Sequence, residues 1–174
     1  MLSENRGLTG VFAKRTHAYM GANCTSIEQF MVVLDWLIRQ RPDSAYSRFC
    51  LFRIAFENPQ TLGSTFGAAD AMRRLNQFGT LLASTVRHTD LVARELSVFW
   101  TLTPECNSEI VRSRLDEIVM KVEELGLDVV PCSVGAHVLP LEHAEISGAR
   151  VLLDHLASLP AHHRFGPAHD YAIS

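Results

Sequence analysis

Residues 87–105, RHTDLVARELSVFWTLTPE, contain the turn and the apolar run around which the rest of the sequence is interpreted. Arg87 and Asp90 bracket a charged turn, and the residues after it are rich in the β-branched and aromatic side chains that favour strands. The pattern predicts two strands within residues 91–103, joined by a tight turn. Apolar residues dominate this hairpin, including the part where the chain must turn through solvent. The apolar tip is therefore the feature that an account of the protein has to explain.

The composition is that of one ordinary globular domain. The chain has 174 residues, 47% of them hydrophobic and 20% charged, which is enough for a full core. Its net charge of −3 and pI near 6.2 provide no bulk electrostatic attraction to DNA, RNA or an anionic membrane. No run approaches the roughly 20 apolar residues that span a bilayer, and the start lacks the apolar core of a secretory signal. We expect a cytoplasmic protein that binds neither DNA nor RNA and does not insert into membranes.

Hydrophobic periodicity predicts helices and strands in alternation along the chain. In chain order the sequence predicts a capped helix from Ser26 to before Pro42, a strand over 47–56, a loop over 57–67, a helix over 72–86, the hairpin, a helix over 108–125, a strand over 128–139 and a helix over 144–158. This order predicts an α+β domain in which one sheet is covered by helices. We expect an N-terminal arm over 1–24, one domain over 25–160 and a C-terminal tail, mostly loop, over 161–174.

Cysteine and histidine spacing indicates no metal site. The four cysteines are Cys24, Cys50, Cys106 and Cys132, which are widely spaced and form no C-x-x-C pair. This spacing favours buried reduced thiols, and two disulfides are the alternative. The later histidines match no zinc pattern and are expected to be exposed or in the tail: His137, His143, His155, His162, His163 and His169. Phosphate-loop, nucleophile-elbow and dinucleotide fingerprints are absent. We therefore expect no metal and no cofactor.

The hairpin and its flanks resemble a known family. The pattern R-x-x-D-x-x-A-R before a hairpin, with S-x-G on a later strand, is similar to the GGDEF domain of diguanylate cyclases. Its pieces here are Arg87, Asp90, Ala93, Arg94, Ser133 and Gly135. The segment LFRIAFENPQTLGSTFGAADAM (51–72) occupies the place of the family motif that begins L-L-D-I-D. The resemblance covers residues 27 to about 155 and implies a palm-like, ferredoxin-like three-layer sandwich with a central, mostly antiparallel sheet covered by helices.

The same resemblance implies that this is a degenerate GGDEF-like domain. In the family, the first acid of D-x-D helps to hold Mg²⁺ beside GTP; here Arg53 takes that position and Ala55 the next. The guanine-reading asparagine falls on Thr61, while its aspartate partner falls on Asp70. Residues 96–100, LSVFW, stand where G-G-[DE]-E-F is expected, so the second metal-binding acid is lost as well. Because joining two GTP molecules needs a divalent metal, we expect no catalytic residue and no enzyme activity.

The R-x-x-D pattern matches the family's inhibitory site for cyclic di-GMP. The resemblance implies that Arg87 donates two parallel hydrogen bonds to a guanine while Asp90 accepts from the opposite edge of the base. His88, between them, and Arg94, on the first strand, are further candidate ligand contacts.

Two points about this pattern stay open in the sequence. A complete family site adds an arginine from the following helix; Arg112 and Arg114 are candidates, although the alignment places Val119 at that position. A simpler interpretation also stands, in which Arg87 complements a helix C-terminus and forms a surface ion pair with Asp90.

The leading expectation is thus a catalytically inactive signalling domain that acts as a cyclic di-GMP receptor or adaptor. The first alternative is a nucleotide-independent module that docks a signalling protein, or a second copy of itself, through the hairpin from Leu96 to Trp100. The second alternative is an enzyme, either a cyclase that works only beside an active partner or an unrelated activity of the palm fold. Both tryptophans, Trp36 and Trp100, are expected to be at least partly buried.

Overall fold

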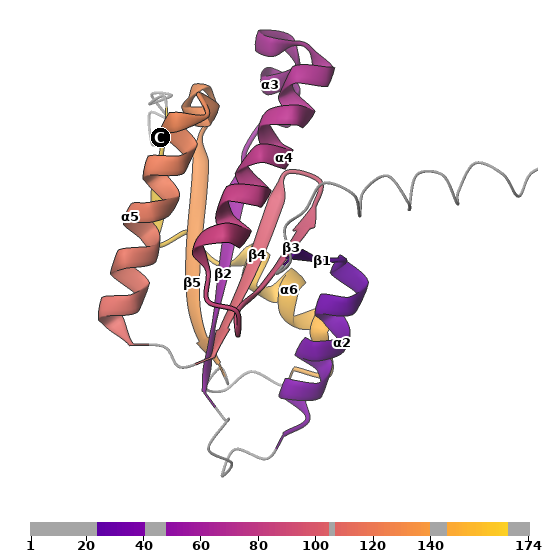
Figure 1. Cartoon of the computed structure of the whole chain (residues 1–174). Coiled ribbons are helices and arrows are strands. Elements are labelled where there is room, and N and C mark those ends of the chain that lie inside the picture. The colour runs from indigo at the N-terminus through magenta and orange to yellow at the C-terminus, as the bar shows by residue number, and fades with distance from the viewer. Residues whose placement is uncertain (1–23, 41–47, 105–106, 140–145, 167–174) are drawn as a thin grey trace, which may run out of the picture.

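The computed structural model describes residues 24–40, 48–104, 107–139 and 146–166 (Figure 1). They form a six-stranded sheet with the order β1-β3-β4-β2-β5-β6, in which β1 is parallel to β3 and every other pairing is antiparallel. Helices pack on both faces of this sheet. The expected α+β, palm-like three-layer sandwich is therefore confirmed. Among the described residues, no helix is both long and apolar enough to cross a bilayer.

The elements in chain order are β1 (Cys24–Thr25), α2 (Ile27–Ile38), β2 (Phe49–Phe56), α3 (Pro59–Phe66), α4 (Ala68–Thr85), β3 (Leu91–Glu95), β4 (Val98–Pro104), α5 (Ser108–Glu124), the 3-10 turn η2 (Leu127–Val129), β5 (Cys132–Leu139), α6 (Ala149–Ser158) and β6 (His163–Phe165). The predicted capping residue Ser26 begins α2, where its Oγ accepts a hydrogen bond from the Gln29 N–H at 3.2 Å. Except for Cys24, the predicted N-terminal arm lies outside the described residues, as do Cys106, His143 and His169.

Two elements fall where the sequence predicts loop. The segment 57–67 contains α3, which begins with Pro59 in the first helical turn and ends at Gly67, whose φ of +82° suits glycine. The predicted tail contains β6, which pairs with β5 through residues such as Arg164, opposite Ser133. Loop was the wrong prediction for both segments, because a two-turn helix and a three-residue strand are too short to show a hydrophobic period.

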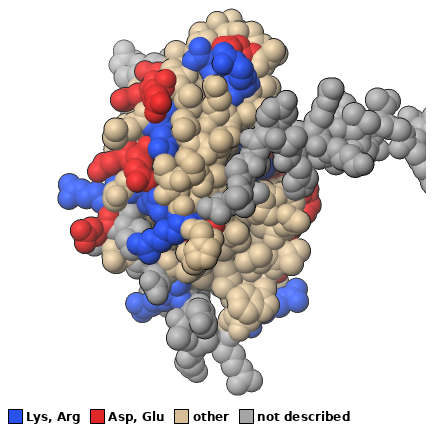
Figure 2. Space-filling model, viewed as in Figure 1, with Lys and Arg blue, Asp and Glu red and all other residues tan. Residues whose placement is uncertain are grey.

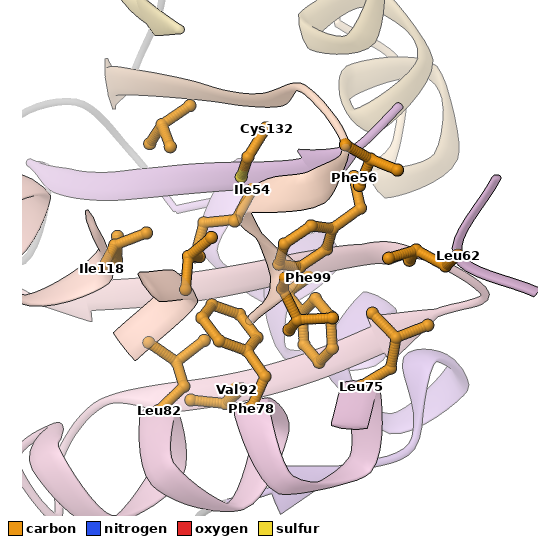
Figure 3. Packing of buried hydrophobic residues seen from close by; sticks show 14 of the residues in the cluster. Ile54, Phe56, Leu62, Leu75, Phe78, Leu82, Val92, Phe99, Ile118 and Cys132 are labelled. Carbon is orange, nitrogen blue, oxygen red and sulfur yellow. The ribbon is translucent and has the colours of Figure 1, made fainter. Parts of the chain in front are cut away.

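The sheet separates two hydrophobic cores. On one face, Ile54 and Phe56 of β2 pack with α4 and α5; around Phe56, Phe78 and Phe99 three rings meet edge to face (Figure 3). On the other face, Leu51 and its neighbours pack with α2 and α6. Because both faces of β2 are covered, seven of its eight residues are buried, and the strand lacks the polar alternation of a one-sided sheet.

The first and last described helices are joined directly. The Ala149 N–H, at the start of α6, donates a 2.6 Å hydrogen bond to Oδ1 of Asp35 on α2. A Cβ added to Gly148 would lie 3.2 Å from that oxygen, so the glycine leaves room for this contact. Asp35 therefore acts as a cap for α6 from another helix, a role that local sequence patterns do not reveal. Two of the cysteines, Cys50 and Cys132, are buried as reduced thiols in this fold, as expected.

Candidate functional site

The charged turn between α4 and β3 is closed by reciprocal hydrogen bonds. The Asp90 N–H donates to the Arg87 carbonyl at 2.9 Å, and the Arg87 N–H donates to Oδ2 of Asp90 at 3.0 Å. The Asp90 side chain is completely buried, whereas Arg87 and His88 are exposed. The turn thus holds a carboxylate inside the protein and a guanidinium outside it.

A second arginine reaches this carboxylate from α5. Nη2 of Arg114 lies 3.2 Å from Oδ2 of Asp90, and its Nη1 donates to the Thr85 carbonyl at 2.9 Å and to Glu117 at 3.0 Å. Arg114 therefore ties α5 to the end of α4 and to the turn. Among the candidates Arg112, Arg114 and Val119, Arg114 is the residue that contacts Asp90.

Among the described residues, only one of the two carboxyl oxygens of Asp90 has a hydrogen-bond partner. Burial raises its pKa above the ordinary range, while the hydrogen bond from Arg87 and the charges of Arg114 and Arg87 act in the opposite direction. Its Oδ1 is buried and has no hydrogen-bond partner among the described residues. A buried acceptor without a hydrogen-bond partner costs free energy, so this oxygen is an unsatisfied polar group inside the turn.

The fourth predicted ligand contact, Arg94, lies away from the turn of Arg87 and Asp90. Its guanidinium hydrogen-bonds Asn76 of α4, its Nε donates to the Leu96 carbonyl at 2.6 Å, and it lies 5.4 Å from the ring centroid of Phe99. Asn76 is about three helical turns, on the order of 16 Å, before the turn at Arg87. The structure brings Arg87, His88 and Asp90 together and separates Arg94 from them. The simple ion-pair interpretation is also corrected, since the charged partner in contact with Asp90 is Arg114.

A second region is the part of the sheet that the sequence resemblance aligns with metal-binding strands. In the register of the sheet, Arg53 on β2 lies between Trp100 on β4 and Gly135 on β5, and Ala55 lies beside Val98. Nε of Arg53 is buried without a hydrogen-bond partner among the described residues, and burial lowers the pKa of this guanidinium. Within the described part of the chain, no group of three or more histidine, cysteine, aspartate or glutamate side chains is arranged to hold a metal ion.

The hairpin tip is a two-residue turn of Leu96 and Ser97. Leu96 is 85% exposed and has a φ of +56°, a left-handed conformation that disfavours residues other than glycine and asparagine. The neighbouring Phe99 and Trp100 are buried on opposite faces of the sheet. The predicted docking surface from Leu96 to Trp100 is therefore wrong for its two aromatic residues, because adjacent strand residues point to opposite faces and both faces are covered.

The residues aligned with guanine recognition are not paired with each other by any described contact. Asp70 on α4 forms ion pairs with Arg73 and Arg74, and hydrogen bonds from these arginines lower its pKa. Thr61 is exposed on α3. Arg74 also donates to the Leu125 carbonyl, and its guanidinium carbon lies 4.0 Å from the ring centroid of Phe66, so it links α4 to α3 and to the segment after α5. A hollow of about 760 Å³ between α4 and the end of α5 is lined by residues that include Met72, Arg73, Asn76, Gln77, Leu81 and Leu125.

One histidine expected to be exposed is buried. His137 is 7% exposed on β5, and its ring centroid lies 5.2 Å from that of His162. Nδ1 of His162 accepts a hydrogen bond from the Ala136 N–H at 3.1 Å. Burial, followed by the nearby charges of His162, His155 and Arg53, lowers the pKa of His137 to about 4. The reason for the wrong prediction is that His137 lies opposite Leu51 and points to the same face of the sheet as Leu139, a face that α2 and α6 cover.

The lowered pKa of His137 leads us to expect a loss of folding stability in mild acid. Its pKa falls from about 6.5 in the unfolded chain to about 4 in the fold, so the unfolded state takes up the proton first as pH decreases. The contribution is complete above pH 6.5 and is lost as pH falls toward 4, by up to about 3 kcal/mol at 1.36 kcal/mol per pKa unit. Urea unfolding at several pH values should show this loss, and His137→Leu should flatten it. The exposed His163, changed to Leu, is the control, and equal slopes in all three proteins would contradict the prediction.

Comparison with known proteins identifies the fold. No family model matches the sequence, and no curated protein matches it. Among solved structures, the GGDEF domain of DgcB from Caulobacter crescentus, in complex with cyclic di-GMP, is similar with a TM-score of 0.62 and 14% identity, over 80% of this chain and 86% of that one. The FimX GGDEF domain from Pseudomonas aeruginosa has a TM-score of 0.60 and 17% identity, over 80% of this chain and 90% of that one. The GGDEF domain of YfiN from the same species has a TM-score of 0.58 and 18% identity, over 75% and 83%. At these identities the likeness establishes a GGDEF fold.

Proposed function

We propose that this chain, which has the fold of a GGDEF domain, is a catalytically inactive signalling domain that binds cyclic di-GMP at the turn of Arg87 and Asp90. The observation that carries the proposal is the half-used carboxyl group of Asp90, buried beside one exposed arginine and one inward-facing arginine. A guanine donates from N1 and its amino group on one edge and accepts at O6 and N7 on another. The turn contains the complementary groups for both edges.

Each group at the turn has a distinct task in this proposal. Among the described residues, the Arg87 guanidinium makes no hydrogen bond, so it can donate two to O6 and N7 of a guanine. Oδ1 of Asp90 accepts from the donor edge of the base, which requires this buried oxygen to become accessible when the ligand binds. Arg114 supplies a fixed positive charge beside the Asp90 carboxylate. Arg94, far along β3, takes no part.

The ligand class is supported by a protein of the same fold. The DgcB GGDEF domain was crystallised in complex with cyclic di-GMP. Extending that ligand to this chain rests on the arrangement at the turn, because the two sequences share 14% identity. The role as receptor or adaptor follows if binding occurs without synthesis.

The affinity for cyclic di-GMP should depend on Arg87. Arg87→Ala should weaken binding by about 2–3 kcal/mol, the scale of a charge-assisted bidentate contact. That is roughly a 30- to 150-fold loss, because each 1.4 kcal/mol is a factor of ten. Arg87→Lys should recover little, since an ammonium lacks the planar fork of the guanidinium. Calorimetric titration of the wild type and both variants measures this.

The matched control is Arg112→Ala, which removes an exposed arginine from α5 that has no described contact with the turn. Its affinity should stay within twofold of the wild type. If the Arg87 variants also stay within twofold, or if the wild type fails to bind cyclic di-GMP at tens of micromolar, the turn is a structural feature and the proposal is wrong.

The proposed inactivity has its own measurement. Arg53 occupies the place of the family's metal-binding aspartate, and Ala55 and Val98 lie side by side where acids would be needed. Incubation with GTP and Mg²⁺ or Mn²⁺ should yield no cyclic di-GMP above a blank without protein. Replacing residues 96–99 with Gly-Gly-Asp-Glu should not restore synthesis, because Arg53 and Thr61 remain. Product that disappears on Asp70→Ala would overturn this part of the proposal.

A further inference from the structure

The outer face of α2 carries an apolar stripe. Val32 is 68% exposed, Val33 37% and Trp36 57%, on the side of the helix opposite the buried Phe30 and Leu34. Burial was the expectation for Trp36, and it is wrong. The other large exposed apolar residues of the described chain are single ones on separate elements: Met72, Leu96, Met120, Val138 and Val151. Figure 2 shows that the charged side chains on this face of the molecule gather over α5 and near the upper end of α4, whereas the described surface over α2 is mostly uncharged. A contiguous apolar stripe of this kind marks an interaction surface.

Opposite charges lie at the two ends of the stripe. Glu28 is exposed in the first turn of α2, and Arg39 is exposed at its C-terminal cap. They are about three turns apart, on the order of 16 Å, so they cannot pair with each other within one helix. They can pair between two antiparallel copies of the same helix. In that arrangement Trp36 of each copy covers Val32 of the other, and each Glu28 faces an Arg39.

We propose that the outer face of α2 is a homodimerisation surface, occupied by α2 of a second copy in antiparallel orientation. The stripe is complementary to itself in both shape and charge, which is the requirement of a two-fold symmetric interface. One helix face buries less than a standard interface of about 800 Å² per partner, so the dimer is weak and reversible. The surface lies on the α2–α6 side of the sheet, and the turn at Arg87 lies on the α4–α5 side. Dimerisation and nucleotide binding are therefore independent properties.

Association is measured by sedimentation equilibrium and tryptophan fluorescence over about two decades of protein concentration, up to about 500 μM. The second tryptophan, Trp100, is 3% exposed, so a change of emission with concentration reports on Trp36. The wild type should approach the dimer mass while its emission shifts to the blue. Trp36→Ser should weaken association at least tenfold. Met120→Ser, which removes a 69% exposed apolar residue from α5, should leave it unchanged.

Charge reversal tests the antiparallel register. Glu28→Lys and Arg39→Glu should each weaken the dimer about five- to tenfold, and the double variant should recover most of the loss, as expected for a pair that forms between copies. Because Glu28 also lies near Arg150, thermal melts of each variant check that the monomer stays folded. A double variant no tighter than the single ones would overturn the antiparallel arrangement.

Three further outcomes overturn the dimer. The first is a wild type that stays monomeric at every concentration. The second is an association that Trp36→Ser does not weaken, which would place the contact elsewhere. The third is blue-shifted Trp36 emission at the lowest concentration, where the protein is monomeric, which would mean that residues 1–23 cover the face. Arg87→Ala should not change the dimerisation constant, so failure of this inference is distinguishable from failure of the proposed function.

Discussion

Replacing Phe78 with alanine is expected to lower the free energy of unfolding by about 3–5 kcal/mol. Phe78 is fully buried on α4, with its ring centroid 5.2 Å from that of Phe56 and 4.9 Å from that of Phe99 (Figure 3). Both contacts are edge to face, which adds about 0.5–1.5 kcal/mol for each pair beyond the area buried. The substitution removes both contacts and leaves a cavity between α4 and the sheet.

Equilibrium unfolding in urea, followed by circular dichroism, measures this loss. Phe78→Leu is the matched control, since it keeps most of the volume and should cost clearly less than alanine. Phe66→Ala, at a partly buried position beside the same cluster, should also cost less. A loss below about 1.5 kcal/mol for Phe78→Ala would mean that the three rings are not the centre of this core.

The second large effect is expected for Arg114→Met, at about 2–4 kcal/mol of unfolding free energy. The substitution keeps much of the side-chain volume but leaves the Asp90 carboxylate fully buried without its charged partner, and its Oδ1 is already unpaired. Removing one partner of a buried pair is strongly destabilising for this reason. Arg112→Met, at an exposed position on the same helix, should change stability by less than about 0.5 kcal/mol.

The pH dependence of the Arg114 variant has a definite sign. Burial raises the pKa of Asp90 in the fold, and loss of Arg114 removes one of the influences that lower it. The folded state then holds a proton that the unfolded state releases, so stability is present at low pH and is lost as pH rises through the folded pKa. The deficit of Arg114→Met should therefore be larger at pH 8 than at pH 5. Adding Asp90→Asn should recover part of the loss at pH 8, and a deficit independent of pH would contradict this explanation.

The positions of the main elements could be predicted because their side chains repeat at helix or strand spacing. The hairpin, the capped helix that begins after Ser26 and the long helix α4 all show such repeats. Arg114 also had a detectable signal, since it lies four and eight residues before Ile118 and Val122 on the buried side of α5. An arginine on an apolar stripe indicates a buried ion pair, but the identity of its partner requires the tertiary fold.

Other features had no local signal. His137 and Trp100 are buried because helices cover both faces of the sheet, and strand periodicity alone does not indicate how many faces are covered. β6 is held in place by backbone pairing with β5, and three residues are too few to show the side-chain alternation of a strand. The exposure of Trp36 was equally hidden, because a tryptophan on an amphipathic helix is usually assigned to the core.

The strand order also constrains how the chain reaches its native state. β2 lies in the middle of the sheet, between β4 and β5, and residue pairs such as Leu51 and His137 come from distant parts of the sequence. The entropy of closing such long loops is lost before the native contacts between these strands form. We therefore expect folding in the slower, millisecond-to-second class of domains. Until β5 arrives, β2 presents an apolar strand with an open edge, which is the arrangement most prone to intermolecular pairing. Aggregation during refolding should therefore begin at residues 49–56, and a chain that ends before β5 should be recovered mainly as aggregate.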